Sequence, residues 1–358
     1  MRTKFDIYVF IIIIAINTIF IHFSFESALG VPIPYWDSRM DFEMTNPTQS
    51  ILWTHKYFGN GFGMVKTGPF ANFNTPIGLL FRNIGSDGSL FSREGIDNVL
   101  RKSQLSQISE PTAMEESSLE GHHNGVHIWV DGLMNNLALS PHDPIFYTHH
   151  SFVDYVWEQF RRKQMKNGIN PYTETVTPPD TVEFQNKTDP AVGLTGYYNI
   201  DGYSKMIANL YTYSSRTQFP VCSSGPGMFC DNRKQAHVSR QRPPQEYEGQ
   251  RNEAMSMAMD MGMMNNGPNA KPFDLYSRDM RVRMDSVTMD YESMSTGNGA
   301  SIMNNDMNND MNMHMEYANP MSRNGMSMRT TRRHKSSYEP YFERFESPRP
   351  ITHRHHAY

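Results

Sequence analysis

The sequence is poor in cysteine, in net charge and in apolar residues. Its 358 residues include two cysteines, which excludes a disulfide framework and leaves one bridge, Cys222 to Cys230, if the compartment is oxidising. The formal net charge is −4, so nothing indicates nucleic acid or another charged partner. Apolar residues make up 38%, which is low for one large core and favours a folded part shorter than the whole chain.

No apolar run is long enough to predict a stable membrane span. The longest covers residues 7–21, follows Arg2 and Lys4, and precedes Ala28-Leu29-Gly30, which is the layout of a secretory signal cleaved near Gly30. We therefore interpret residues 1–30 as a signal-like apolar segment and expect a secreted, extracellular protein. An uncleaved signal anchor is the alternative. The sequon Asn186-Lys187-Thr188 would make it a glycoprotein in that compartment.

Branched apolar residues are scarce in the last third of the chain. Of the 27 methionines, 18 lie between Met255 and Met328, in runs that lack helical or strand periodicity. Such a segment buries too little surface to offset its ordering entropy. We therefore predict a folded domain over residues 31–230 and a long disordered Met/Asn-rich tail over residues 231–358. Thioether clusters suit Cu(I), so copper delivery by the tail is one hypothesis, and a low-complexity matrix or assembly segment is the other.

Histidine, by contrast, is concentrated. Six of the 14 histidines lie between Leu119 and Lys163. His123 and His127 are four residues apart, so a helix places both imidazoles on one face. A third ligand, His149 or His150, begins a second apolar helical pattern after a Ser-Pro-His-Asp-Pro turn. Three imidazoles from two antiparallel helices form a bundle-type metal site, and nitrogen-only ligation suits copper or zinc.

The neighbours of these histidines narrow the ligand set. We predict His150 as the third ligand because Asp154 follows it by four residues and can accept from its other ring nitrogen. His149 points about 100° away around the helix, which leaves it beside the ligands rather than among them. No glutamate forms HExxH with His123 and His127, so a zinc protease is excluded.

The remaining pattern predicts a mainly α-helical domain. Helical spacing covers residues 92–105 with Ser92 as N-cap, residues 120–130, and a long segment starting at Asp143-Pro144. Residues 202–211 form another candidate helix. Residues 31–74 are punctuated by proline and glycine and are expected to form ordered loop with short helical turns.

Several motifs together resemble one family. LEG, HNGVHIWVDGLM and SPHDPIFYTHHSFVDYVW resemble the second copper-binding (CuB) region of tyrosinases, which are type 3 copper proteins, while PYWDS, ILWTHKYFGNGFG and TGPFANF resemble the stretch between their two copper regions. The resemblance spans about residues 25–213. It implies a helical bundle around copper, with His123, His127 and His150 as CuB ligands. It also implies that Glu120 and Asn124 hold a water that deprotonates a phenol, whose pKa near 10 otherwise disfavours binding as phenolate.

The resemblance also implies two copper ions, each on three histidines, and only one ligand set is present. Before Glu120 the chain has only His22 and His55, and Thr18 stands where a ligand of the first copper is expected. We therefore expect a domain that is incomplete at its N-terminal side. One explanation is an incomplete 5′ end, which the family-like FESAL at residues 25–29 favours. The other is a genuine protein with one copper half-site.

Two functions follow. The first is a copper-dependent phenol oxidase, a monooxygenase-type oxidoreductase that uses O2 to convert monophenols or o-diphenols to quinones for pigment or matrix cross-linking. The second is a secreted structural protein that keeps one copper half-site without catalysis and contacts extracellular matrix proteins, similar to secreted tyrosinase-like proteins of molluscan shell.

Overall fold

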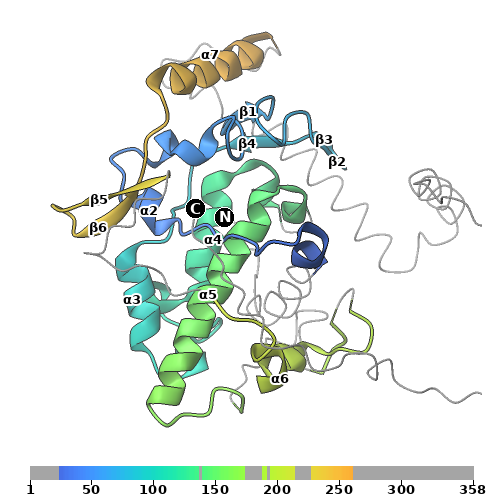
Figure 1. Cartoon of the computed structure of the whole chain (residues 1–358), viewed down its shortest axis with the longest axis vertical. Coiled ribbons are helices and arrows are strands. Elements are labelled where there is room, and N and C mark those ends of the chain that lie inside the picture. Colours follow the sequence, from blue (N-terminus) through green and yellow to red (C-terminus); the bar gives the residue numbers. More distant parts are fainter. Residues whose placement is uncertain (1–23, 137–138, 174–187, 192–193, 214–226, 261–358) are drawn as a thin grey trace, which may run out of the picture. The chain divides into compact units, whose positions relative to one another are not determined.

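Three helices form the centre of the fold in the computed structural model (Figure 1). They are α3 (Arg93–Arg101), α4 (Leu119–Val130) and α5 (Ile145–Lys166), and α3 contacts both of the others. The structure describes residues 24–136, 139–173, 188–191, 194–213 and 227–260. Most of the signal-like segment, the sequon asparagine, Cys222 and residues 261–358 lie outside this part.

The capping residues explain where these helices begin. The Ser92 hydroxyl accepts from the backbone N–H of Gly95 (2.9 Å), and the Ser118 hydroxyl accepts from Gly121 (2.9 Å). Each satisfies an N–H that the helix itself leaves unpaired. All three predicted helices are confirmed, but α3 ends at Arg101 and α5 begins one residue after Pro144.

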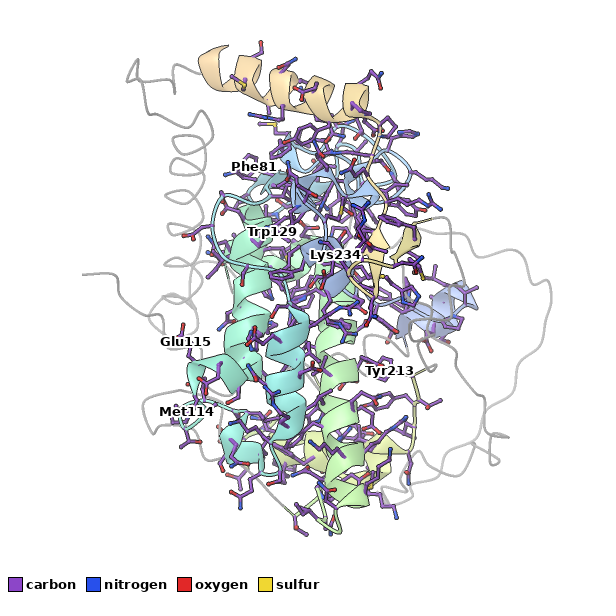
Figure 2. The ribbon with its side chains drawn as sticks, turned by 90° about the vertical axis from the view of Figure 1, so that its left-hand side faces the viewer. Phe81, Met114, Glu115, Trp129, Tyr213 and Lys234 are labelled. Carbon is purple, nitrogen blue, oxygen red and sulfur yellow. The ribbon has the colours of Figure 1, made fainter. Side chains whose placement is uncertain are left out.

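The core is built from the apolar faces of these helices. Six branched or aromatic side chains of α4 and α5 have at most 1% of their surface exposed: Val126, Val130, Phe152, Val153, Val156 and Phe160. In Figure 2, Trp129 and Phe81 lie toward one end of α4, and Met114 and Glu115 toward the other. The same packing holds the buried faces of the helices, and hence the histidines on them, in place.

A small antiparallel hairpin begins within residues 31–74, which the sequence predicts as ordered loop with short helical turns. Its strands β1 (Phe62–Met64) and β4 (Phe81–Asn83) pair Gly63 with Arg82, and the shorter strands β2 (Asn74–Thr75) and β3 (Gly78–Leu79) lie between them in sequence. Gly63 has a φ of +71°, a conformation that glycine adopts without strain. Short strands containing glycine lack the alternation that predicts strands. The predicted helical turn before them is observed as α2 (Arg39–Phe42).

The hairpin is tied to the start of α5 by a buried ion pair. The Nε and Nη2 atoms of Arg82 donate to the two carboxylate oxygens of Asp143 at 2.8 and 2.7 Å, and both side chains are fully buried. Arg82 also donates to the carbonyl of Phe58 (2.7 Å). Asp143 in turn accepts from the backbone N–H of Ile145 (3.1 Å), so this pair fixes the first turn of α5.

Helix and strand continue past residue 230, where the sequence predicts the start of a disordered tail. Strands β5 (Met228–Asp231) and β6 (Ala236–Ser239) form a second hairpin, and α7 (Pro244–Asp260) follows it. Arg242 donates to the carbonyl of Trp53 (2.8 Å), as does Gln250 (3.1 Å). Ala236 and Val238 are buried. These hydrogen bonds and buried side chains hold residues 228–256 against the domain, although the segment is poor in branched apolar residues.

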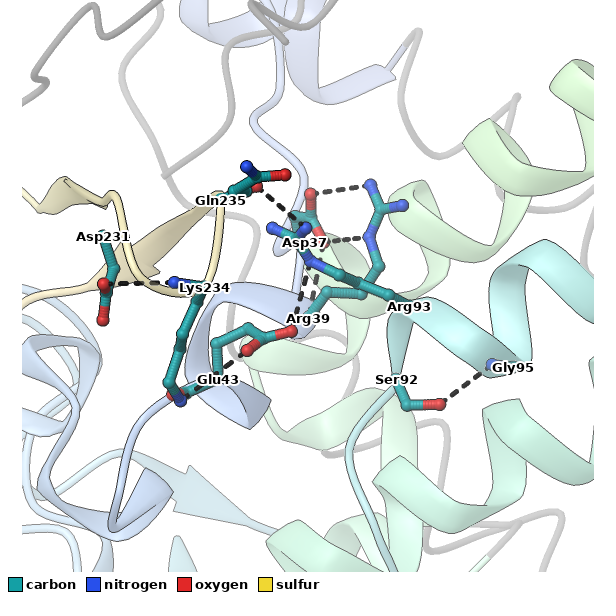
Figure 3. Close-up of polar contacts among 9 residues, drawn as sticks. All are labelled: Asp37, Arg39, Glu43, Ser92, Arg93, Gly95, Asp231, Lys234 and Gln235. Carbon is teal, nitrogen blue, oxygen red and sulfur yellow. Dashed lines mark hydrogen bonds and ion pairs between the residues drawn. The ribbon is translucent and has the colours of Figure 1, made fainter. Parts of the chain in front are cut away.

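Ionic contacts hold the turn of this second hairpin. Lys234 and Arg93 both pair with Glu43, at 3.7 and 3.2 Å, and Arg93 also donates to the carbonyl of Gln235 (3.2 Å) (Figure 3). The β6 strand contacts α2. Segments from three distant parts of the sequence therefore meet here.

The predicted helix over residues 202–211 is observed only as α6 (Lys205–Ala208), which follows a 3-10 turn at Asn199–Tyr203. Residues 24–29 are helical, and Phe25 packs edge-on against Tyr147 near the start of α5, with ring centroids 5.1 Å apart. Within the described residues, no helix combines the length and apolar character needed to cross a bilayer.

Candidate metal centre

Two helices supply four histidines to one buried cluster. His123 and His127 lie on the buried face of α4 with 2% and 8% of their surface exposed, and His149 and His150 lie in the first turns of α5 with none exposed. One ring nitrogen from each of the four falls within 4.8 Å of the others. The predicted ligands His123, His127 and His150 are thus brought together, and His149 joins them.

Three of these rings point the same nitrogen at a common centre. The Nε2 atom of His150 lies 3.1 Å from Nε2 of His127 and 3.4 Å from Nε2 of His123. Metal–nitrogen bonds of about 2.0 Å in tetrahedral geometry place neighbouring donor nitrogens about 3.3 Å apart. The three residues therefore fit one metal ion, and an all-imidazole donor set suits copper or zinc.

The other nitrogen of each α4 ring has its own acceptor. Nδ1 of His123 lies 2.9 Å from the side-chain oxygen of Asn124, and Nδ1 of His127 lies 2.6 Å from the carbonyl of Met134, in the 3-10 turn Gly132–Asn135. An oxygen acceptor at Nδ1 fixes the proton there, so the lone pair of Nε2 faces the centre. The Met134 carbonyl carries no signal in the sequence, because any residue supplies one.

Burial keeps the α4 rings neutral. It lowers the pKa of His127 to about 4, against the opposing effects of the Met134 carbonyl and the Asp143 charge. It lowers the pKa of His123 well below its ordinary value, and the neighbouring His127 and His149 lower it further. A metal ligand must be deprotonated, so these rings are ready to bind at neutral pH.

The two predicted catalytic residues lie beside the cluster and are engaged by protein groups. Glu120 is 1% exposed, and its carboxylate accepts from the hydroxyl of Ser109 (2.8 Å) and from the backbone N–H of Glu110. Asn124 contacts His123. Glu120 thus fastens the 109–110 loop to α4, and Asn124 orients a ring of the cluster. Their predicted shared water stays a prediction.

Asp154 contacts different partners from those predicted. Its carboxylate oxygens accept from the hydroxyls of Tyr213 (2.5 Å) and Tyr211 (3.4 Å). A spacing of four residues places Asp154 and His150 on one side of α5, but the tyrosines of the 211–213 segment take up the carboxylate instead of the ring. The predicted hydrogen bond from His150 is therefore replaced by a link between α5 and the segment after α6.

The comparisons with known proteins agree with this geometry. Residues 20–163 match the common central domain of tyrosinase. The chain is 31% identical over 211 residues to a tyrosinase of Streptomyces antibioticus, an alignment covering 49% of this chain and 74% of that protein. The chain belongs to the tyrosinase family. The matched tyrosinase segment ends at Lys163 in α5 and includes all four histidines.

Molluscan members of the tyrosinase family are also similar. Tyrosinase-like protein 1 of Margaritifera margaritifera is 33% identical over 231 residues, covering 58% of this chain and 46% of that protein. A tyrosinase-like protein of Pinctada maxima is 31% identical over 241 residues, covering 61% of this chain and 52% of that protein. The chain thus spans about half the length of these relatives.

Proposed function

We propose that the chain binds copper through His123, His127 and His150 and oxidises phenols or catechols with O2. The observation that carries the proposal is the convergence of three Nε2 atoms, 3.1 and 3.4 Å apart, inside the segment matched to tyrosinase. Copper, when bound, supplies the redox chemistry that links O2 to phenol oxidation. Zinc supplies none, so the family membership favours copper over zinc.

The chain's own residues would shape the site around the ion. Buried neutral imidazoles bind the ion without first losing a proton. The ring of Phe146 lies over that of His150, with centroids 3.9 Å apart, and helps to exclude water on that side. Asn124 and Met134 hold the tautomers of the two α4 ligands. These contacts limit the movement of the ligands, which favours tight binding.

The second candidate is an extracellular matrix protein that keeps one copper without turnover. It is favoured by a specific observation: the described residues contain one cluster of side chains able to ligate a metal, the four histidines. A family member that uses two coppers needs a second ligand set. Secretion, proposed for either function, is supported by Cys230, which is disulfide-bonded, because such bonds persist in oxidising compartments.

Copper content and oxygen uptake separate these proposals. The full chain is loaded with Cu(II), its copper per chain is measured, and oxygen consumption is followed with a catechol. The control pair is His127→Gln in the cluster and His55→Gln at an exposed histidine whose side chain is 74% accessible. Copper-dependent uptake that is lost only in His127→Gln supports the oxidase. Bound copper without uptake supports the matrix protein, and no copper binding contradicts both.

A further inference from the structure

The chain leaves α4 through an aspartate whose backbone conformation normally requires glycine. Asp131 directly follows α4 and has φ +57° and ψ −159°, a region that is essentially open to glycine alone. A negative charge at the C-terminal end of a helix is also unfavourable to the helix dipole. Both local preferences disfavour aspartate here, and a residue held against such preferences points to a function for its side chain.

The carboxylate of Asp131 accepts three hydrogen bonds from two other segments. One oxygen accepts from the side-chain amide of Asn83 in β4 (3.2 Å) and from the hydroxyl of Ser86 (3.1 Å), and the other accepts from the side-chain amide of Asn135 (3.2 Å). Asp131 is 1% exposed, so these hydrogen bonds form away from water, where they are strongest. They hold the 3-10 turn Gly132–Asn135 beside the hairpin of β1 and β4.

The backbone of Asp131 connects the same turn to His127. The N–H of Asp131 donates to the carbonyl of His127 (3.1 Å), and the carbonyl of Asp131 accepts from the N–H of Met134 (3.2 Å). Met134 presents its own carbonyl to Nδ1 of His127 at 2.6 Å. Asp131 thus lies between His127 and the acceptor of its ring proton, so a change in the dihedral angles of Asp131 moves one relative to the other.

Gly132 shows that the turn packs directly against β4. Its φ is +58°, and a Cβ at this position would clash with the carbonyl oxygen of Phe81. The turn therefore has no room to move closer to the hairpin. Movement away from β4 remains, and the hydrogen bonds from Asn83 and Ser86 to Asp131 oppose it.

We propose that Asp131 is a positioning residue for the metal centre: its carboxylate holds the turn that carries the Met134 carbonyl, and this carbonyl keeps the proton of His127 on Nδ1, so that Nε2 faces the metal. The proposal rests on the copper site proposed above and adds a residue that acts on it through Met134. Glycine would adopt the same backbone without strain, but it would offer no acceptor to the three donors.

The test first locates the ring proton of His127 in metal-free full-length chains. Nitrogen NMR of chains with isotope-labelled histidine reports which ring nitrogen is protonated, and the His127 signal is identified by its loss in His127→Gln. We expect the proton on Nδ1 in the wild type and a mixture of both tautomers in Asp131→Gly. Asp131→Asn keeps one oxygen acceptor and tolerates a positive φ, so it should restore most of the Nδ1 tautomer.

Copper binding is measured separately, by competition with a chelator. Asp131→Gly should bind copper about tenfold more weakly than the wild type, at the lower end of the usual loss for groups that surround metal ligands. The control is Asn72→Gly, which replaces an exposed residue with the same φ of +57°. It should keep the wild-type tautomer and the wild-type copper affinity.

The outcomes separate this proposal from the proposed function. A single Nδ1 tautomer in Asp131→Gly overturns the positioning role even if copper affinity falls, and so does an unchanged copper affinity. A wild type that binds no copper overturns the proposed function, and the tautomers still decide the role of Asp131. If Asp131→Gly does not fold, Ser86→Ala removes one donor to the carboxylate instead: a second tautomer of His127 then supports the proposal, and the wild-type tautomer contradicts it.

Discussion

The side-chain oxygen of Asn124 lies 2.9 Å from Nδ1 of His123, the residue immediately before it on α4. Neighbouring residues on a helix point in different directions, so this contact requires both side chains to turn toward each other. Its effect is to hold the proton of His123 on Nδ1 and to direct Nε2 at the cluster. Asn124 is therefore a positioning residue in this structure, whatever it does toward a substrate.

Replacing Asn124 should weaken copper binding, because Nδ1 of His123 loses its hydrogen-bond acceptor. Asn124→Ala is expected to lower copper affinity by about 10–100-fold, the usual cost of losing such a partner. Asn124→Asp keeps an oxygen at the same place and should restore most of the affinity. Competition with a copper chelator measures both. Equal affinity in Asn124→Ala and the wild type would show that the contact does not position the ring.

The carboxylate of Glu120 already accepts hydrogen bonds from protein groups, so replacing Glu120 should change the stability of the fold. Glu120 accepts from Ser109 and from the backbone N–H of Glu110, and an amide can replace only part of this. Glu120→Gln should lower the free energy of unfolding by about 1–3 kcal/mol, as a buried N–H is left facing another donor. Urea denaturation measures it.

The matched control is Glu94→Gln, an exposed glutamate in the first turn of α3. A Glu120→Gln chain as stable as this control, but slower with monophenols than with catechols, would instead favour the role that the family resemblance implies.

Much of the helical framework is predictable from the sequence. Ser92 and Pro144 mark helix starts by local chemistry, and the apolar spacing in α3, α4 and α5 needs no tertiary information. The same reasoning finds His123 and His127, which are four residues apart, and leaves His149 or His150 as the third ligand at a second helical start. The choice of His150 relied on Asp154, whose carboxylate contacts Tyr213 and Tyr211 in the structure. The residues that chemistry places on one helix face are then found together in the fold.

The rest depends on contacts between distant segments. Gly63 pairs with Arg82 across two strands, and Arg242 contacts Trp53. Neither contact leaves a periodic pattern in the sequence, so the sequence does not predict the hairpins or the start of α7. Helical spacing makes His150 a possible partner of Asp154. Tyr213 is distant in sequence, and only the fold brings its hydroxyl within hydrogen-bonding distance of the Asp154 carboxylate. The place of His149 likewise depends on how α4 and α5 pack, not on its sequence neighbours.

The buried Arg82–Asp143 pair should dominate the stability of the region around the cluster. Arg82→Met leaves the Asp143 charge buried without its partner, so the free energy of unfolding should fall by about 3–5 kcal/mol. Copper affinity should fall as well, because Asp143 holds the first turn of α5, which directly precedes His149 and His150. Urea denaturation and chelator competition measure the two effects.

Lys66→Met is the control for that pair. Lys66 lies 3.4 Å from Glu253 in an ion pair whose side chains are 41% and 53% exposed, and loss of an exposed pair costs at most about 1 kcal/mol. If Arg82→Met cost no more than Lys66→Met, the buried pair would not be what anchors α5.

Asp154 should give the chain a measurable pH dependence. Burial raises its pKa from 3.8 to about 6, against the opposing hydrogen bond from Tyr213. The folded state therefore keeps a proton that the unfolded state releases. As pH rises between these two values, wild-type stability loses up to about 1.4 kcal/mol per pH unit from this group, and no more above the upper value.

Asp154→Asn carries no such proton, yet its amide oxygen can still accept from Tyr213. The free energy of unfolding of the variant minus that of the wild type should therefore rise from about pH 4 to about pH 6 and then level off. The buried histidines titrate in both chains and cancel in this difference. Asp97→Asn, an exposed aspartate of α3, controls for the loss of one negative charge. A difference independent of pH would mean that folding does not change the affinity of Asp154 for its proton, and that the tyrosine hydroxyls fully compensate for its burial.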